Sequence, residues 1–242
     1  MKSRLTLTLL MAIIAVSAYS QTADEVISRY LVKIGGIEKW KELKSRKMIA
    51  TLSMQGTDLP ATMYEKPMVM KRLEIKVPGI EIIQTYNGKE GWMLNPQMGT
   101  EPIKLNAEQS KDFAEDEFED KFIDFKKKGH EATLLGVEEI DGIKCFKIQL
   151  LKNKNNDRED IKEVYFFDAE TYLPVMEIGY KTRDQNVIEL KNYLGDYHEV
   201  NGLMFPFYQE TKIGSETIQK LTVEKIILNE PMDDSLFTLA KK

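Results

Sequence analysis

From Arg46 onward, apolar and polar side chains alternate along most of the chain. The first such run places apolar residues at every second position: Met48, Ala50, Leu52 and Met54. A period of two is typical of a β-strand with one buried face. Similar runs follow between turn signals such as Pro78-Gly79 and Asn87-Gly88, which favour hairpins. The pattern therefore predicts about ten to twelve consecutive antiparallel strands.

Helical spacing occurs at two points in the chain. Thr22-Ala-Asp-Glu25 has the spacing of a capping box, so a helix is expected to begin there and to end at Gly35-Gly36. A shorter helical piece over 37–43 carries Trp40. A further helix is expected over 106–128, with an acidic first half and a basic end that suit the helix dipole. Its apolar stripe consists of Ala114, Phe118, Phe122 and Phe125.

These elements predict one α+β domain over residues 21–242. Strand 203–212 has an apolar face and a mostly polar face, as in a sheet that is dry on one side only. We expect a strongly curved antiparallel sheet that forms an unclosed β-barrel, with the helices lying across its apolar concave face. The last residues should form an irregular tail that is anchored by Leu236 and Phe237.

Residues 1–20 have the organisation of a secretory signal peptide. Lys2 and Arg4 precede an apolar run from Leu5 to Val16, and cleavage is expected after Ser20. A membrane anchor is the alternative, but the apolar run is shorter than the roughly 20 residues that span a bilayer. The prediction is an exported protein with no membrane span after cleavage. Loss of two basic residues leaves 32 basic and 39 acidic side chains, so nucleic acid is not an expected partner.

The residues that could carry catalysis or bind a metal are few and scattered. Cys145 is the only cysteine and lies in a strand pattern, which indicates a buried, inert thiol. His130 and His198 lie in separate predicted turns. Asp196, His198 and Glu199 could in principle bind a metal, although surface turn residues explain them better. We therefore expect no enzyme, no cofactor and no metal site.

Methionine is the unusual component of this sequence. Ten methionines follow residue 20, and seven of them fall between Met48 and Met98. Their flexible, polarisable side chains suit an apolar surface that must adapt to varied partners, while ordinary core filling is the alternative. We expect the concave face to hold an acyl chain. The candidate lining residues are Met48, Met54, Leu73, Trp92, Phe146, Ile148, Leu150, Phe205 and Phe207.

Five motifs occur in an order that resembles a known family. They are Tyr86–Pro96 (YNGKEGWMLNP), Gly136-x3-Ile-Asp-Gly142, Tyr165–Pro174, Asp196–Pro206 and Ile227–Phe237. Together they resemble the outer membrane lipoprotein-sorting protein family, the relatives of the periplasmic carrier LolA found in Bacteroidetes-type bacteria. The resemblance covers nearly all of the chain after residue 20. It implies an unclosed barrel with an apolar cavity under helices, and periplasmic binding of lipidated proteins or lipids.

The leading hypothesis is a non-enzymatic periplasmic carrier for the acyl chains of lipoproteins or lipids, with sorting components of the inner or outer membrane as further partners. An envelope-stress sensor or protein-interaction module of the same fold is the second hypothesis, and it predicts an exposed apolar patch outside the barrel. A hydrolase or other enzyme is the third, and it predicts a cleft with convergent polar groups.

Overall fold

The computed structural model describes residues 21–107, 109–110, 117–152, 161–183 and 186–239. The predicted signal peptide at 1–20, Ala114 and the whole polar loop at 153–160 lie outside these ranges. Within the described residues, the structure has no helix with the length and hydropathy of a membrane span.

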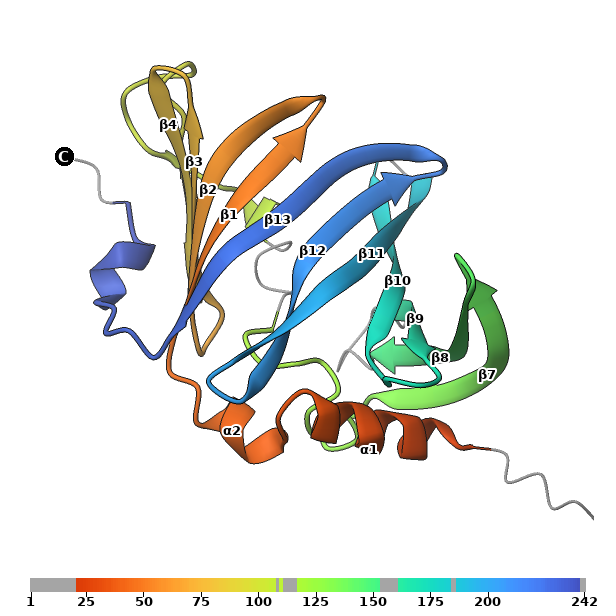
Figure 1. Ribbon diagram of the computed structural model, residues 1–242. Coiled ribbons are helices and arrows are strands. Elements are labelled where there is room, and N and C mark those ends of the chain that lie inside the picture. The colour runs from red at the N-terminus through yellow and green to blue at the C-terminus, as the bar shows by residue number, and fades with distance from the viewer. Residues whose placement is uncertain (1–20, 108, 111–116, 153–160, 184–185, 240–242) are drawn as a thin grey trace, which may run out of the picture.

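All the described strands form one antiparallel sheet (Figure 1). Their order is β6-β5-β4-β3-β2-β1-β13-β12-β11-β10-β9-β8-β7, so the first and the last strands pair at the centre. The strands are β1 (Arg46–Met54), β2 (Thr57–Lys66), β3 (Met70–Val77), β4 (Ile80–Asn87), β5 (Gly91–Leu94), β6 (Ile103–Lys104), β7 (Glu131–Ile140), β8 (Ile143–Lys152), β9 (Ile161–Asp168), β10 (Pro174–Arg183), β11 (Asn186–Val200), β12 (Leu203–Ile213) and β13 (Glu216–Leu228).

The sheet curves strongly but does not close, because β6 and β7 are its two free edges. This confirms the predicted α+β fold with an unclosed antiparallel barrel. The predicted strand number was slightly low, since the sheet has 13 strands. One strand that the pattern missed is β6, which has only two residues and shows no period of its own.

Two helices cover one end of the concave face (Figure 1). The helix α1 (Ala23–Lys33) begins at the predicted capping box, where the Glu25 amide donates to the Thr22 hydroxyl (3.2 Å) and the Thr22 amide to the Glu25 carboxylate (2.9 Å). The helix α2 (Ile37–Lys41) follows directly. Gly35, at φ +109°, joins them; a Cβ there would lie 2.2 Å from the Gly202 carbonyl oxygen, so only glycine fits.

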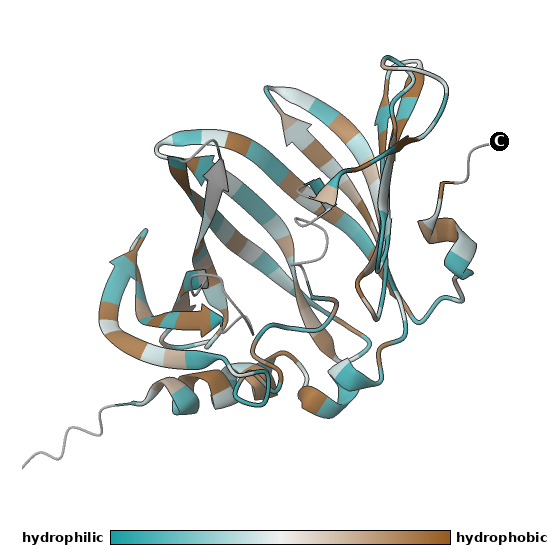
Figure 2. Ribbon diagram, turned by 180° about the vertical axis from the view of Figure 1, so that it is seen from behind, coloured by the Kyte–Doolittle hydropathy of each residue, from teal (hydrophilic) through white to brown (hydrophobic). Residues whose placement is uncertain are grey.

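The main hydrophobic core lies between these helices and the concave face. It combines apolar residues of α1 and α2 with inward-facing side chains from both halves of the sheet. Figure 2 shows the apolar and polar bands that alternate along the strands. Strand β1 illustrates the pattern, because Met48, Ala50 and Leu52 are buried whereas Lys47, Ile49 and Thr51 are only half-buried.

The prediction of a helix continuing to residue 128 was wrong. Residues 117–129 form bends and consecutive turns instead. The Asp120 side chain accepts a hydrogen bond from the Phe122 amide (3.0 Å), and Asp124 has φ +52°, which a right-handed helix cannot accommodate. Phe118, Phe122 and Phe125 are still buried, so their contacts with the core fix this segment in place of helical hydrogen bonding.

The chain ends on the opposite, convex face. A short 3₁₀ helix, η1 (Asp234–Phe237), lies against β3 and β4 outside the curve of the sheet (Figure 1). Phe237 is fully buried, and Arg72 donates to the Leu236 carbonyl oxygen (3.0 Å). The predicted apolar anchor of the tail is therefore confirmed.

Candidate functional site

Strand register aligns the inward-facing side chains into rows that cross the β1–β5 half of the sheet. In the first row, neighbouring strands contribute Ile226, Met48, Met63, Leu73, Gln84 and Met93. The second row consists of Val223, Ala50, Ala61, Ile75 and Ile82. A third begins with Leu221, Leu52 and Leu59. These three rows are thus apolar, with Gln84 as the exception.

Burial falls along these rows from the centre of the sheet toward its edge. Met48, Ala50 and Ala61 are 9%, 1% and 3% exposed and belong to the main core together with residues of the helices. Beyond them lie half-buried side chains that we call the apolar wing: Met63, Leu73, Ile75, Ile82 and Met93. Part of the hydrocarbon and thioether surface of the apolar wing is exposed to water. Binding of a nonpolar ligand that covers this surface would therefore be favourable.

A charged row borders the apolar wing on the side of the helices. Arg46 donates to the Glu65 carboxylate (2.6 Å), and its guanidinium lies 5.7 Å from the ring centres of both Phe118 and Phe205. Lys71 is the cross-strand neighbour of Glu65. The sequence analysis did not single out Arg46. The sequence gives one hint: Arg46 precedes Met48 by two residues, so in a strand both side chains point to the same face.

A second polar group holds the 117–129 segment to the other half of the sheet. Glu163 on β9 accepts from Lys152 (2.9 Å), from Lys121 (3.3 Å) and from the Tyr165 hydroxyl (2.5 Å). Burial acts to raise the pKa of Glu163, but Lys121 and Lys152 with the hydrogen bonds from Lys152 and Tyr165 outweigh it and lower the pKa to about 2. The carboxylate is therefore ionised at neutral pH and serves as a structural anion.

A buried pair joins the same segment to α1. The Tyr30 hydroxyl donates to Asp120 at 2.5 Å. Burial raises the pKa of Asp120 above its ordinary value, although the hydrogen bonds from Tyr30 and Phe122 oppose that change. Burial and the neighbouring Asp120 raise the pKa of Tyr30. These contacts fix the segment inside the curve of the sheet, where it occupies part of the concave face.

The structure brings most of the candidate lining residues together. Met48, Ile148, Leu150 and Phe205 are buried within the main core. Leu73, Phe146 and Phe207 are partly buried and pack against that core. These seven residues belong to one hydrophobic cluster, and Leu73 is the one that lies in the apolar wing.

The remaining two candidates lie elsewhere. Met54 is 40% exposed at the end of β1, beyond the part of the face that the helices cover. Trp92, on β5, is the cross-strand partner of Thr85, and Thr85 is the partner of Arg72. Arg72 donates a hydrogen bond to η1, so these three side chains are on the face against which η1 lies. Because successive residues of a strand point to opposite faces, Trp92 lies on the convex face, opposite to Leu73. Including Trp92 in the lining was therefore wrong.

Cys145 is fully buried in a second, small cluster with Val164, Phe166 and Met176. Its burial confirms that part of the prediction, while inertness stays a prediction; burial also raises the pKa of the thiol to about 11. We expect Cys145 in the folded protein to resist iodoacetamide at about pH 8 and to react fully once the chain is unfolded in urea. Mass spectrometry of both samples measures this, and fast alkylation of the folded protein would contradict the assignment.

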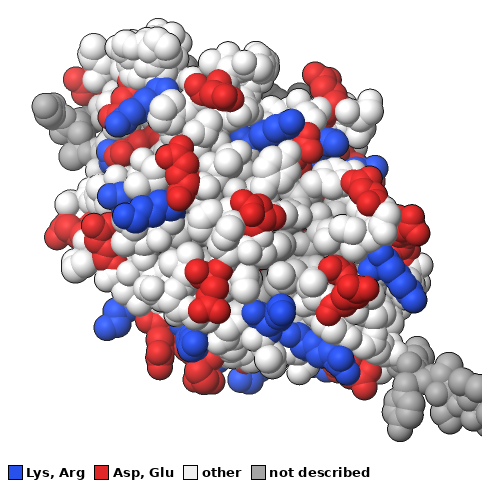
Figure 3. Space-filling view, viewed as in Figure 1, with Lys and Arg blue, Asp and Glu red and all other residues white. Residues whose placement is uncertain are grey.

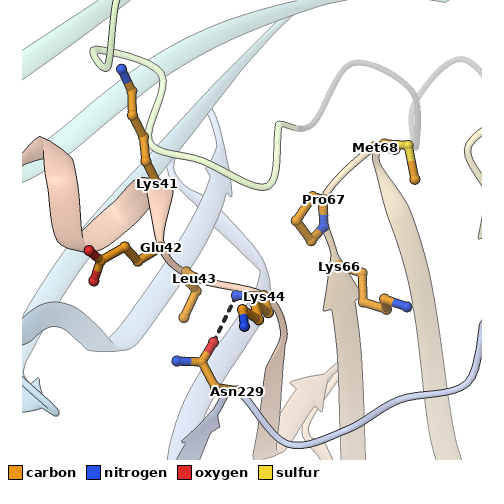
Figure 4. A pocket seen from close by; sticks show the side chains of 8 residues that line it. All are labelled: Lys41, Glu42, Leu43, Lys44, Lys66, Pro67, Met68 and Asn229. Carbon is orange, nitrogen blue, oxygen red and sulfur yellow. Dashed lines mark hydrogen bonds between the residues drawn. The ribbon is translucent and has the colours of Figure 1, made fainter.

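Neither His198 nor the pocket beside α2 forms a convergent polar site. His198 contacts Asp196 (2.8 Å), and the described residues contain no group of three potential metal ligands. A pocket of about 680 Å³ lies beside α2 and the β2–β3 turn (Figure 4). Lys41 and Lys66 point in different directions there, and each is paired with its own carboxylate, Asp124 and Asp234. On the face in Figure 3, acidic and basic side chains are interspersed.

The fold defines the class of protein: a curved, unclosed antiparallel barrel with helices on its concave face. Among the solved structures that share it are three with TM-scores above 0.55. They are a DUF1329 family protein from Desulfovibrio piger (TM-score 0.59, 11% identity, 89% of this chain and 97% of that one), a LolA superfamily protein from Nitrosomonas europaea (0.57, 14%, 90% and 98%) and a putative outer membrane lipoprotein-sorting protein domain from Vibrio parahaemolyticus (0.56, 10%, 88% and 94%). The resemblance to the LolA-like proteins is thereby confirmed at the level of the fold.

A protein-family model described as "Uncharacterized protein" matches residues 68–241, and the chain belongs to that family. A comparison with curated protein sequences gives no match.

Proposed function

We propose that this protein binds acyl chains of lipoproteins or lipids on its concave face, in the periplasm, without catalysis. The observation that carries the proposal is the apolar wing: cross-strand rows that are buried under the helices at the centre of the sheet continue as half-buried Met, Leu and Ile side chains toward its edge. Such a surface is suited to a flexible hydrocarbon chain, since methionine side chains adapt their shape to it.

Burial of apolar surface is the driving force. A chain that covers about 200 Å² of the apolar wing gains roughly 5 kcal/mol at about 25 cal/mol per Å². Part of that gain offsets the loss of motional freedom on binding. The resulting affinity is moderate, which is useful in a carrier that must also release its cargo. The direction of transfer then depends on a partner with higher affinity for the same chain.

The structural neighbours support a carrier role. One of them is a putative outer membrane lipoprotein-sorting protein domain, and another is a LolA superfamily protein. By analogy, sorting components of the inner and outer membrane are the proposed donors and acceptors of the cargo. An N-terminal signal peptide ending at Ser20 would bring the chain into that compartment.

A pair of matched substitutions tests the proposal. Met63→Gln combined with Met93→Gln places two amides in the apolar wing at nearly constant side-chain volume. Met70→Gln makes the same change at a half-buried position on the opposite face, next to Arg72. We expect the double variant to bind a fluorescent fatty acid roughly tenfold more weakly than the unmodified protein, and Met70→Gln to bind it equally well.

The measurement is a fluorescence titration on the chain from residue 21, with mass spectrometry of lipids that co-purify from cells. Failure of the unmodified protein to bind any acylated probe, together with purification free of lipid, would disprove the function. If the double variant binds the probe as tightly as the unmodified protein, the binding site lies outside the apolar wing.

A further inference from the structure

The strand β7 is the longer of the two free edges of the sheet. It has 10 residues, whereas the other edge, β6, has two. In the described part of the chain, β8 is the only strand that pairs with β7. An edge strand carries a row of backbone N–H and C=O groups that point away from the sheet and can pair with another chain.

The side chains of β7 lack two of the usual protections of an edge strand. Proteins commonly place lysine or proline on an exposed edge to prevent pairing, and Glu131–Ile140 contains neither. Instead, Leu135 is 50% exposed and Val137 is 54% exposed, and Ile143 on the adjoining β8 is 39% exposed. The register with β8 shifts between Leu134 and Gly136, so Leu135 is the extra residue of a bulge. Val137 pairs with Phe146, which faces the main core, so the two exposed residues lie on opposite faces of the edge. The edge therefore presents apolar surface beside its free backbone groups.

The charge of the edge is negative throughout. Strand β7 carries Glu131, Glu138 and Glu139 and no basic side chain. Glu138 is paired with Lys147 of β8 (2.8 Å), whereas Glu131 and Glu139 form no ion pair with any described residue. Two exposed carboxylates thus flank a short apolar centre.

We propose that β7 is a docking edge for an extended peptide segment of a protein partner, which adds a strand to the sheet. The chemistry of the edge specifies that segment: backbone groups for strand pairing, apolar side chains against Leu135 and Val137, and Lys or Arg at positions near Glu131 and Glu139. The edge uses no residue of the apolar wing, so this inference stands apart from the binding of acyl chains.

A second copy of the same chain fits this edge poorly. Pairing of two copies of β7 would bring Glu131, Glu138 and Glu139 of both chains onto one ribbon, and neither β7 contributes a basic residue. Like charges that face each other across a strand pair destabilise it. A basic segment removes this repulsion.

The test uses the chain from residue 21 and a synthetic ten-residue peptide with valines at its centre and lysines near both ends. Three forms of the peptide are compared: the parent, one with its backbone nitrogens methylated, and one with glutamate in place of lysine. Two protein variants are matched: Val137→Lys on the edge, and Val32→Lys on α1, where Val32 is 75% exposed. Fluorescence anisotropy gives Kd, and amide shifts in NMR spectra locate the site.

We expect the parent peptide to bind with shifts concentrated on β7, and Val137→Lys to weaken binding about tenfold while Val32→Lys has no effect. The methylated and glutamate peptides should bind at least about tenfold more weakly. Equal binding of the methylated peptide, or equal loss in both protein variants, would overturn strand addition. So would a dimer of the free protein that Val137→Lys dissociates, because the edge would then belong to a second copy.

Discussion

Phe167→Ala is expected to lower the free energy of unfolding by about 3–5 kcal/mol, the range for removing a buried phenylalanine. Phe167 is fully buried on β9. Its ring lies 5.2 Å from that of Tyr30 in α1, 5.5 Å from that of Phe122 in the 117–129 segment and 6.1 Å from that of Tyr165. The substitution therefore leaves a cavity where the helix, the segment and the sheet meet.

Urea unfolding of the chain from residue 21, followed by far-UV circular dichroism, measures this effect. Phe146→Ala is the matched control, because Phe146 pairs with Phe167 across β8 and β9 but is only partly buried. We expect the control to lose less than half as much. A loss of under about 1 kcal/mol for Phe167→Ala would contradict the description of this region as the centre of the core.

Glu163→Gln is expected to cost a similar amount, about 3–5 kcal/mol at neutral pH, because it removes the shared anion of a partly buried charge group. Lys152 and Lys121 are 11% and 28% exposed at their side chains and would lose their common partner. By contrast, Glu138→Gln removes an exposed pair with Lys147 and is expected to cost less than about 1 kcal/mol.

The same substitution has a defined pH dependence. The pKa of Glu163 is lowered to about 2 in the folded protein, against about 4.3 for glutamate in an unfolded chain. A carboxylate with a lowered pKa stabilises the fold fully above its unfolded value and loses that contribution as pH falls toward its folded value. The difference in stability between the unmodified protein and Glu163→Gln should therefore shrink between about pH 4.3 and 2. A constant difference across that window would contradict the pKa assignment.

Local sequence signals predicted the parts of the fold that local chemistry determines. The capping box at Thr22 and the alternation of Met48, Ala50 and Leu52 need only neighbouring residues to be recognised, and both are present. The 117–129 segment is different. Its phenylalanine spacing suits a helix, but Phe118, Phe122 and Phe125 are held by contacts with α1, β1 and β9, which lie far away in the sequence. Tertiary packing overrides the local preference there.

The candidate site, like the fold, could be predicted only where neighbouring residues determine it. Alternation identified which residues of one strand share a face, but it does not show which face of the sheet becomes concave. Strand β5 has only four residues, and its Trp92 could not be assigned to a face without the register to β4 and the position of η1. Arg46 was missed because a single charged residue beside an apolar run is typical of a strand end. Its role between two rings appears only in three dimensions.

The pairing of β1 with β13 at the centre of the sheet determines when the molecule can assemble. The strands β2–β6 and β7–β12 are meanders whose neighbours follow one another along the chain, so each can form early from short-range contacts. The two meanders are joined only when β13, the last strand, has been synthesised and pairs with β1. This pairing closes a loop of more than 150 residues. A chain that emerges from a translocation channel N-terminus first would therefore stay in two unjoined halves, with β1 and β12 lacking their common neighbour, until residues 216–228 arrive.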